Sequence, residues 1–152
     1  MITKIPLQLI DLNGDGYHLS LQVRVNGKWA LMILDTGASR TVFDQNRIHR
    51  FVEDQDFETN EQLSTGLGTN SMESAILEID SFVLGEMQLK EYPTVAIDMG
   101  HINQTYETLE MPQIDGVLGG DILRDFYAKI DYSTLILSLK FSKVKYYYSE
   151  DV

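Results

Sequence analysis

The stretch that decides the fold is "ALMILDTGASRTVFD", residues 30–44. An apolar run ends on Asp35, the small residues of "TGAS" follow at once, and "TVF" resumes an apolar pattern. A carboxylate at the end of a buried strand is costly unless it is paired and hydrogen-bonded. Asp and Gly are also common in turns at strand ends, and the tripeptide alone would fit that structural role. The stretch therefore raises two questions: whether Asp35 is a working acid, and where a second acid would come from.

The composition is that of a globular protein with room for one core. The chain has 152 residues, of which 43% are hydrophobic and 23% charged. The net charge of −11 argues against a nucleic-acid partner and disfavours an anionic membrane surface. There is no cysteine, so disulfides, thiol nucleophiles and thiolate metal sites are excluded. Without a signal-peptide pattern we expect a cytoplasmic protein, or a periplasmic or secreted one if a leader has been removed.

Most of the chain has the pattern of β-strands. Residues 17–25 alternate between apolar and polar side chains, as a half-buried strand does. Asn26-Gly27 is a favoured two-residue hairpin turn, so residues 28–34 are expected to pair with 17–25. Further strands are predicted at residues 41–44, in a hairpin within 63–79 with its tip at Gly66 and Gly68, in a hairpin within 81–97 around Gly85, and at 114–118, 128–132 and 134–141.

Helices are expected to be few and short. Asp44 is a candidate N-cap for a short helix over residues 45–52, and Asp121 for another over 121–126. Residues 98–113 form a long connection in which we expect one helical turn. The acidic residues 53–62 are predicted to form a loop or the edge of a sheet.

Two segments share one plan, an apolar strand followed by a sharp glycine turn and a short element. They are "LMILDTGAS" and "DGVLGGDIL", and they could pack about a pseudo-two-fold axis. The chemistry that suits a tightly held Asp is a pair of carboxylates sharing one proton, because two carboxylates in contact cannot both ionise easily. One takes a proton from water and the other gives one to a carbonyl. In this interpretation Thr36 would hold the turn by hydrogen bonds, and Gly37 would leave room for water and substrate.

Three segments together, "LMILDTGAS", "STGLGT" and "IDGVLGGDIL", resemble the retropepsin-like aspartic proteases, most closely the small bacterial members. The resemblance covers about residues 17–141, within one domain spanning 1–152. It implies an all-β acid-protease half-lobe, a closed barrel with one or two short helices. It also implies a homodimer that cleaves extended peptides with one aspartate from each chain, and neither cofactor nor metal.

The same resemblance implies roles for individual residues. Asp35 would be the catalytic acid, Thr36 the source of interlocking hydrogen bonds, Gly37 the turn that faces substrate, and residues 64–71 the flap. The catalytic candidates are Asp35, Thr36 and Gly37, and the substrate-binding candidates are Ala38, Val42, Thr65, Gly66, Leu67, Gly68, Val117 and Leu118.

The chain departs from the family pattern at two places near these motifs. Many viral members have Gly-Arg-Asn or Gly-Arg-Asp in the second motif, with the arginine paired to an acid after Asp-Thr-Gly. This chain has Gly119-Gly120-Asp121, and Ser39 replaces the acid, so the dimer contact must differ. Ala38 has no hydroxyl to donate to an ionised pair, so we expect activity to extend from acid toward near-neutral pH.

Other interpretations of the motifs are weaker. "DLNGDG", residues 11–16, imitates the start of a calcium loop, but the twelfth position is Gln22 rather than a bidentate Glu, and a turn between strands explains it better. His18, His49 and His101 lack metal-ligand spacing. The main rival to a protease is a dimerisation or peptide-binding module that keeps the fold without cleaving peptides.

Overall fold

β3 (Tyr17–Val25) and β4 (Lys28–Leu34) form the hairpin predicted from the sequence. In the computed structural model, which describes residues 1–53, 57–59, 74–142 and 145–146, the turn residues Asn26 and Gly27 have φ of 51° and 84°. Asn and Gly are the residues that adopt this left-handed backbone most readily. The short strand that follows the Asp-Thr-Gly turn, β5 (Val42–Asp44), is also where it was expected.

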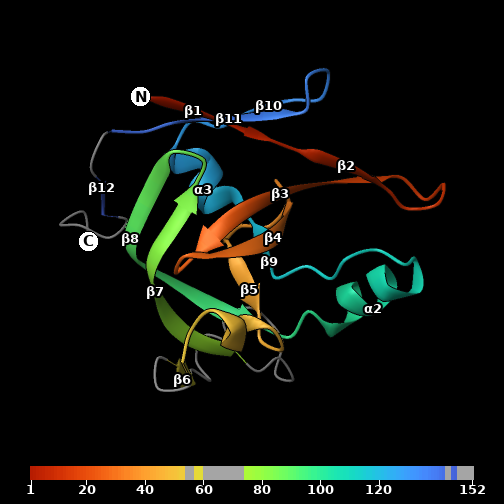
Figure 1. Cartoon of the computed structure of the whole chain (residues 1–152), viewed down its shortest axis with the longest axis horizontal. Helices are drawn as coiled ribbons and strands as arrows, with labels where there is room; N and C mark the ends of the chain where they lie inside the picture. Colours follow the sequence, from red (N-terminus) through yellow and green to blue (C-terminus); the bar gives the residue numbers. More distant parts are fainter. Residues whose placement is uncertain (54–56, 60–73, 143–144, 147–152) are drawn as a thin grey trace.

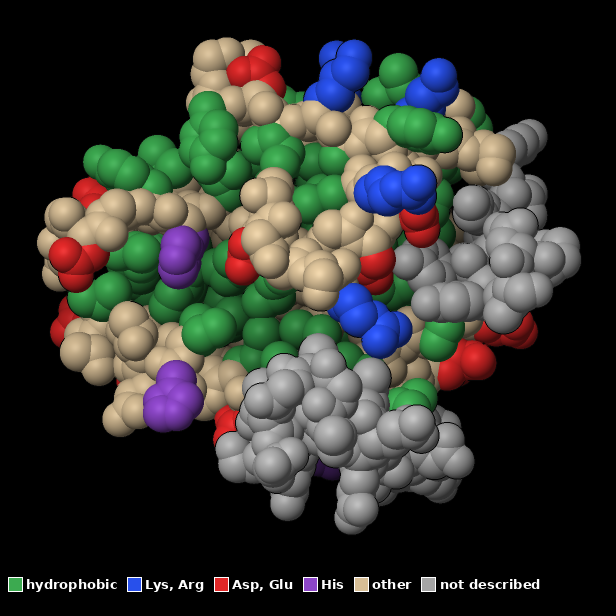
Figure 2. All heavy atoms as spheres, turned by 180° about the vertical axis from the view of Figure 1, so that it is seen from behind, with side chains coloured by type: hydrophobic (Ala, Val, Ile, Leu, Met, Phe, Trp, Pro, Cys, Tyr) green, Lys and Arg blue, Asp and Glu red, His purple; other side chains and the backbone are tan. Residues whose placement is uncertain are grey.

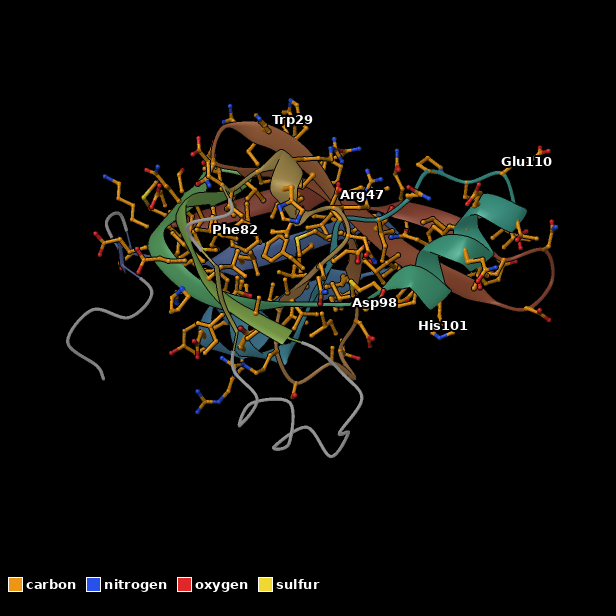
Figure 3. The ribbon with its side chains drawn as sticks, turned by 90° about the horizontal axis from the view of Figure 1, so that it is seen from below. Trp29, Arg47, Phe82, Asp98, His101 and Glu110 are labelled. Atoms are coloured by element: carbon orange, nitrogen blue, oxygen red, sulfur yellow. The ribbon has the colours of Figure 1, made fainter. Side chains whose placement is uncertain are left out.

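Six strands close into a barrel in the order β8-β5-β9-β4-β3-β7, because β7 pairs back onto β8 (Figure 1). The remaining members of this sheet and their bounds are β7 (Ser74–Leu84), β8 (Met87–Ile97), β9 (Gly116–Leu118), β6 (Phe57–Thr59) beside β7, and β12 (Lys145–Tyr146) beside β8. Its interior holds the main core, for example Leu21, Met32 and Phe43, and Figure 3 shows Phe82 inside the barrel and Trp29 outside it. The all-β fold expected from the sequence is confirmed.

A second, three-stranded sheet lies across one end of the barrel (Figure 1). Its strands are β1 (Ile2–Pro6), β11 (Ile136–Lys140) and β10 (Lys129–Asp131), all antiparallel. β1 alternates between exposed and buried residues, so one face of the sheet packs on the core and the other faces solvent. The remaining strand, β2 (Gln8–Asp11), pairs with β3 through the turn at residues 12–16, which supports the turn interpretation of "DLNGDG".

The two α-helices among the described residues are α2 (Gly100–Thr108) and α3 (Gly120–Asp125). α2 has nine residues, longer than the single turn expected for that connection. Residues 45–52 form only a 3₁₀ turn, η1 (Ile48–Arg50). None of the helices in these ranges is both long and apolar enough to cross a membrane.

The prediction that Asp44 caps a helix is wrong. Its side chain is 1% exposed and accepts hydrogen bonds from the backbone N–H groups of Asn46 and Met99, both 3.1 Å, and from the side-chain amides of Asn46 (3.2 Å) and Asn103 (2.9 Å). Four N–H donors satisfy a buried carboxylate without an adjacent cation. Asp44 therefore fastens β5 to α2.

Candidate active site

The site begins where two parallel strands end. β4 and β9 run side by side with Ile33 opposite Val117 and Leu34 opposite Leu118. The next backbone N–H, that of Asp35, donates to the carbonyl of Leu118 at 3.0 Å. The two apolar-strand segments that share one plan in the sequence are thus neighbours in the fold, and Asp35 leaves the sheet directly beside the second one.

The turn at Asp35 holds one oxygen of its carboxylate. The N–H of Gly37 donates to Asp35 Oδ1 at 2.8 Å, and the N–H of Ala38 donates to the Asp35 carbonyl at 3.2 Å. No donor from the described residues reaches Oδ2. Asp35, Thr36 and Gly37 are all exposed in the single chain. The turn presents Asp35 on the surface in a fixed position.

Hydrogen bonds to Gly119 and Gly120 hold the residues that follow the Asp-Thr-Gly turn. The carbonyl of Ala38 accepts from the N–H of Gly120 at 2.7 Å, and Thr41 Oγ1 accepts from the N–H of Gly119 at 3.0 Å. A Cβ on Gly119 would lie 2.5 Å from the carbonyl oxygen of Arg40, so only glycine lets the loop pass this closely. The two glycines of the second motif therefore pack the Asp35 loop against the start of α3.

Asp121 completes this support and does not cap a helix. The N-cap position of α3 is Gly119, and Asp121 lies in the first turn. Its Oδ1 accepts from the N–H and Oγ1 of Thr41, both at 2.8 Å, and its Oδ2 accepts from the hydroxyl of Tyr92 at 2.8 Å. The prediction of an N-cap is corrected: Asp121 joins the loop, α3 and β8.

A pocket of about 640 Å³ lies beside Asp35. Its walls come from β3, β4, α2, β9 and β10, and its lining residues are Tyr17, His18, Leu19, Ile33, Leu34, Asp35, Thr36, Ile102, Val117, Ile130 and Tyr132. Tyr17, Ile102 and Tyr132 are among the large hydrophobic residues that the chain exposes. Exposed apolar side chains around a carboxylate in a concave surface are typical of a binding site.

The predicted substrate-binding residues divide into three groups. Val117 lines the pocket, while Val42, its pairing partner on β5, and Ala38 are half-buried and pack against the same small cluster of apolar residues. Leu118 is fully buried in the main core, so its side chain does not reach the pocket, and it positions Asp35 through its carbonyl instead. Thr65, Gly66, Leu67 and Gly68, with the proposed flap, lie outside the described residues.

His18 lines the pocket, although the sequence pattern did not mark it as a substrate-binding residue. Its Nδ1 lies 2.7 Å from the hydroxyl of Tyr106 on α2, and the two rings stack with centroids 6.0 Å apart. Burial raises the pKa of Tyr106 to about 12, so the phenol stays protonated at any working pH. The partners are 88 residues apart in sequence, and neither residue carries a local signal of the contact.

The other acids near the second motif serve the structure. Asp115 has a side chain 4% exposed, and it accepts from Arg47 Nε and Arg50 Nη1, both at 2.8 Å, and from the N–H of Leu31 at 2.9 Å. Asp131 accepts from the hydroxyl and N–H of Ser133, which lower the pKa of its carboxyl group. Each of these carboxylates is thus bound by groups of its own chain.

A metal site receives no support in the described ranges. There, no three His, Cys, Asp or Glu side chains gather in a way that could hold a metal ion. His49 and His101 are exposed, and Figure 3 shows His101 pointing outward at the start of α2.

The barrel and the strand-end Asp-Thr-Gly turn define a class, the retropepsin-like fold. A crystal structure of a retropepsin-like aspartic protease from Rickettsia conorii matches with a TM-score of 0.60 and 20% identity, over 91% of this chain and 93% of the other. The retroviral protease-like domain of Ddi1 from Leishmania major matches with a TM-score of 0.56 and 15% identity, over 89% and 98%. Both similarities concern the fold.

The sequence itself places the chain in a family. Residues 21–122, two thirds of the chain, match the aspartyl protease family, so the protein belongs to that family. No curated protein matches the chain. The matched range includes the Asp-Thr-Gly turn, both parallel strands and the start of α3.

Proposed function

We propose that the protein is an aspartic endopeptidase that acts as a homodimer, with Asp35 of one chain facing Asp35 of a second. The observation that carries the proposal is the exposed position of Asp35 at the end of β4, beside the parallel strand β9. Asp115 and Asp121 are engaged by donors of their own chain, so neither is available as the second acid. A second copy of the chain would supply it.

The chemistry follows from two carboxylates sharing one proton. The ionised Asp35 accepts a proton from a water molecule, whose oxygen attacks the carbon of the scissile peptide bond. The protonated Asp35 gives its proton to the carbonyl oxygen, which yields a tetrahedral diol. Return of a proton to the amide nitrogen then breaks the C–N bond and releases an acid and an amine. General acid–base catalysis of this kind needs no covalent intermediate.

The pocket beside Asp35 suits an apolar side chain of an extended substrate. Ile33, Ile102 and Val117 supply apolar walls, and His18 supplies a polar group held by Tyr106. A peptide in extended conformation would place alternate side chains toward such a pocket.

The edge of β10 supports the dimer. β10 is the last strand of its sheet and, among the described strands, pairs with β11 alone. An unpaired strand edge is a ready template for a strand of another chain. Ile130 and Tyr132 bring this edge to the Asp35 pocket, so a partner paired there would stand close to Asp35. We place the whole activity in one domain spanning residues 1–152, with its core at about 17–141.

The test is cleavage of a mixed peptide library by the parent chain and by Asp35→Asn, analysed by mass spectrometry between pH 3.5 and 7. We expect cleavage by the parent and none by the variant. Asp125→Asn is the matched control, because Asp125 is an exposed acid on α3 that is paired only weakly with Arg124, at 3.5 Å. We expect this variant to cleave as the parent does.

Two outcomes would remove the proposal. If Asp35→Asn cleaves peptides as fast as the parent, a residue other than Asp35 carries the activity. A parent chain that binds peptides but cleaves none at any pH would instead favour the non-proteolytic peptide-binding module.

A further inference from the structure

Three lysines gather on the solvent face of the three-stranded sheet. Lys4 on β1 and Lys129 on β10 both lie opposite Ser138 of the central strand β11, one from each side. Lys140 follows two residues along β11, so it points to the same face. All three are exposed. We call Lys4, Lys129 and Lys140 the lysine face.

The lysine face is positively charged, whereas the net charge of the chain is negative. The sequence holds 12 basic and 23 acidic residues, yet none of the three lysines forms an ion pair with a described residue. Asp131 shares the face; its carboxylate accepts hydrogen bonds from Ser133 and Thr134, which are neutral, and it keeps its negative charge. On this face of the three strands, three lysines stand against one carboxylate, that of Asp131, so the face carries a local positive charge that an anionic ligand would complement.

The same face carries apolar groups and a shallow hollow. The hollow has a volume of about 750 Å³, and its lining residues are Ile2, Lys4, Tyr127, Lys129, Ser138, Leu139 and Lys140. Ile2 is 60% exposed and Tyr127 71% exposed. Figure 2 shows basic side chains among hydrophobic ones along its upper edge, where Figure 1 has β1, β11 and β10. The surface thus offers cations and apolar contacts together.

We propose that the lysine face binds a short acidic segment of another polypeptide. Lys4 and Lys129 stand two strand spacings apart, about 10 Å, and Lys140 lies about 7 Å along the strand from their row. Carboxylates at alternate positions of an extended chain repeat at about 7 Å, which suits this spacing. Tyr127 and Ile2 would contact the apolar parts of the segment.

A short segment fits better than an extended anionic surface. A membrane or a nucleic acid would meet the remaining surface of a chain with net charge −11 and be repelled by it. An acidic peptide a few residues long touches only the lysine face, and at physiological salt charges more than about 8 Å away are largely screened.

The lysine face and the Asp35 pocket meet at β10. Lys129 points to the lysine face, while its neighbour Ile130 lines the pocket. Resting on the proposed function, the acidic segment would belong to a protein substrate and lie away from its scissile bond. Binding at the lysine face itself does not depend on catalysis.

The test measures binding of fluorescein-labelled hexaglutamate by fluorescence anisotropy at about 150 mM salt, where charges more than about 8 Å away are largely screened. The variant combines Lys4→Gln, Lys129→Gln and Lys140→Gln. The charge-matched control combines Arg24→Gln, Lys28→Gln and Arg124→Gln, which are exposed and lie on other elements. We expect Kd to rise at least about tenfold in the lysine variant and less than about twofold in the control. Thermal melts confirm that both variants fold.

Three results would overturn the inference: no binding by the parent, equal weakening in both variants, or binding to phosphatidylserine vesicles without binding to hexaglutamate. A second arm compares kcat/KM for one peptide substrate with and without a glutamate tract. If the parent cleaves neither substrate, the proposed function fails, while the anisotropy result still decides the binding surface.

Discussion

Two acids that follow matching strands have opposite environments. Asp35 follows β4, is exposed, and receives one side-chain hydrogen bond among the described residues, from the N–H of Gly37. Asp121 follows β9 and accepts three, two from Thr41 and one from Tyr92. Asp121 therefore links separate parts of the fold. Asp35 is held in position by the fold, but its carboxylate links no other element among the described residues.

The buried acids extend the comparison. Asp44 accepts four N–H donors and Asp115 binds two arginines and a backbone N–H. A carboxylate saturated in this way is held for structure, because its lone pairs are occupied. Asp35 accepts only one hydrogen bond from the described residues, so it keeps acceptor capacity for water or a second carboxylate, as the proposed reaction requires.

The largest expected effect separates Asp35 from Asp121 directly. Asp35→Asn should reduce kcat/KM for a cleaved peptide by about 10²–10⁴-fold or more, since it removes the acid–base group, and should leave thermal stability nearly unchanged. Asp121→Asn should do the reverse, lowering stability first. Initial-rate assays and calorimetry on both variants check this. If Asp35→Asn and Asp121→Asn lose equal stability, the distinction between a positioned Asp35 and a structural Asp121 is wrong.

The ion pairs of the buried Asp115 should show the next largest effect. Asp115→Asn removes the carboxylate charge that Arg47 and Arg50 bind. Because those side chains are 25% and 51% exposed and stay solvated, the free energy of unfolding should fall by about 1–3 kcal/mol. The measurement is urea denaturation followed by fluorescence of Trp29. Asp125→Asn, which breaks an exposed pair, is the control and should cost less than about 1 kcal/mol. A small change in Asp115→Asn would mean that the pair is not a structural one.

Thr41 tests the support of the Asp35 loop. Thr41→Val removes a donor to Asp121 and the acceptor for the N–H of Gly119 in a buried site, and should cost about 1–3 kcal/mol. The exposed Thr134→Val is the control and should change stability by less than about 0.5 kcal/mol. Catalysis should also fall, because the loop behind Ala38 loosens. If Thr41→Val is destabilised but keeps the kcat of the parent, the support of the loop is not needed for catalysis.

The smallest effect concerns the pH profile. Ala38→Ser adds a hydroxyl next to the Asp-Thr-Gly turn, which should favour the ionised pair and move the acid limb of the rate profile to lower pH by about half a unit to one unit. Profiles of kcat/KM for parent and variant between pH 3 and 8 measure the shift. A parent profile confined below about pH 4, the ordinary range of an Asp side chain, would refute the expectation drawn from Ala38.

Local sequence signals predicted the parts of the fold that depend on neighbouring residues. The alternation in residues 17–25 and the Asn26-Gly27 turn gave β3 and β4, and Gly85 gave the β7–β8 turn. The matching plans of "LMILDTGAS" and "DGVLGGDIL" suggested that the two units could pack about a pseudo-two-fold axis. In the structure their strands, β4 and β9, are parallel neighbours.

Contacts between distant residues could not be predicted in the same way. The sequence predicts that Asp44 and Asp121 cap helices, because an Asp before a short helix usually caps it. Their real donors, such as Asn103 and Thr41, lie 59 and 80 residues away in the chain. The sequence gives no signal that Ile130 lines the pocket, because only the sheet topology brings β10 to Asp35.

The central claim is that one chain supplies only half of the reactive pair. Sedimentation velocity from nanomolar to micromolar concentration, with peptide cleavage measured on the same samples, tests it most directly. We expect specific activity to rise with the dimer fraction and to vanish in the monomer. Full specific activity in samples that sediment only as monomer would contradict it, because a single Asp35 would then suffice.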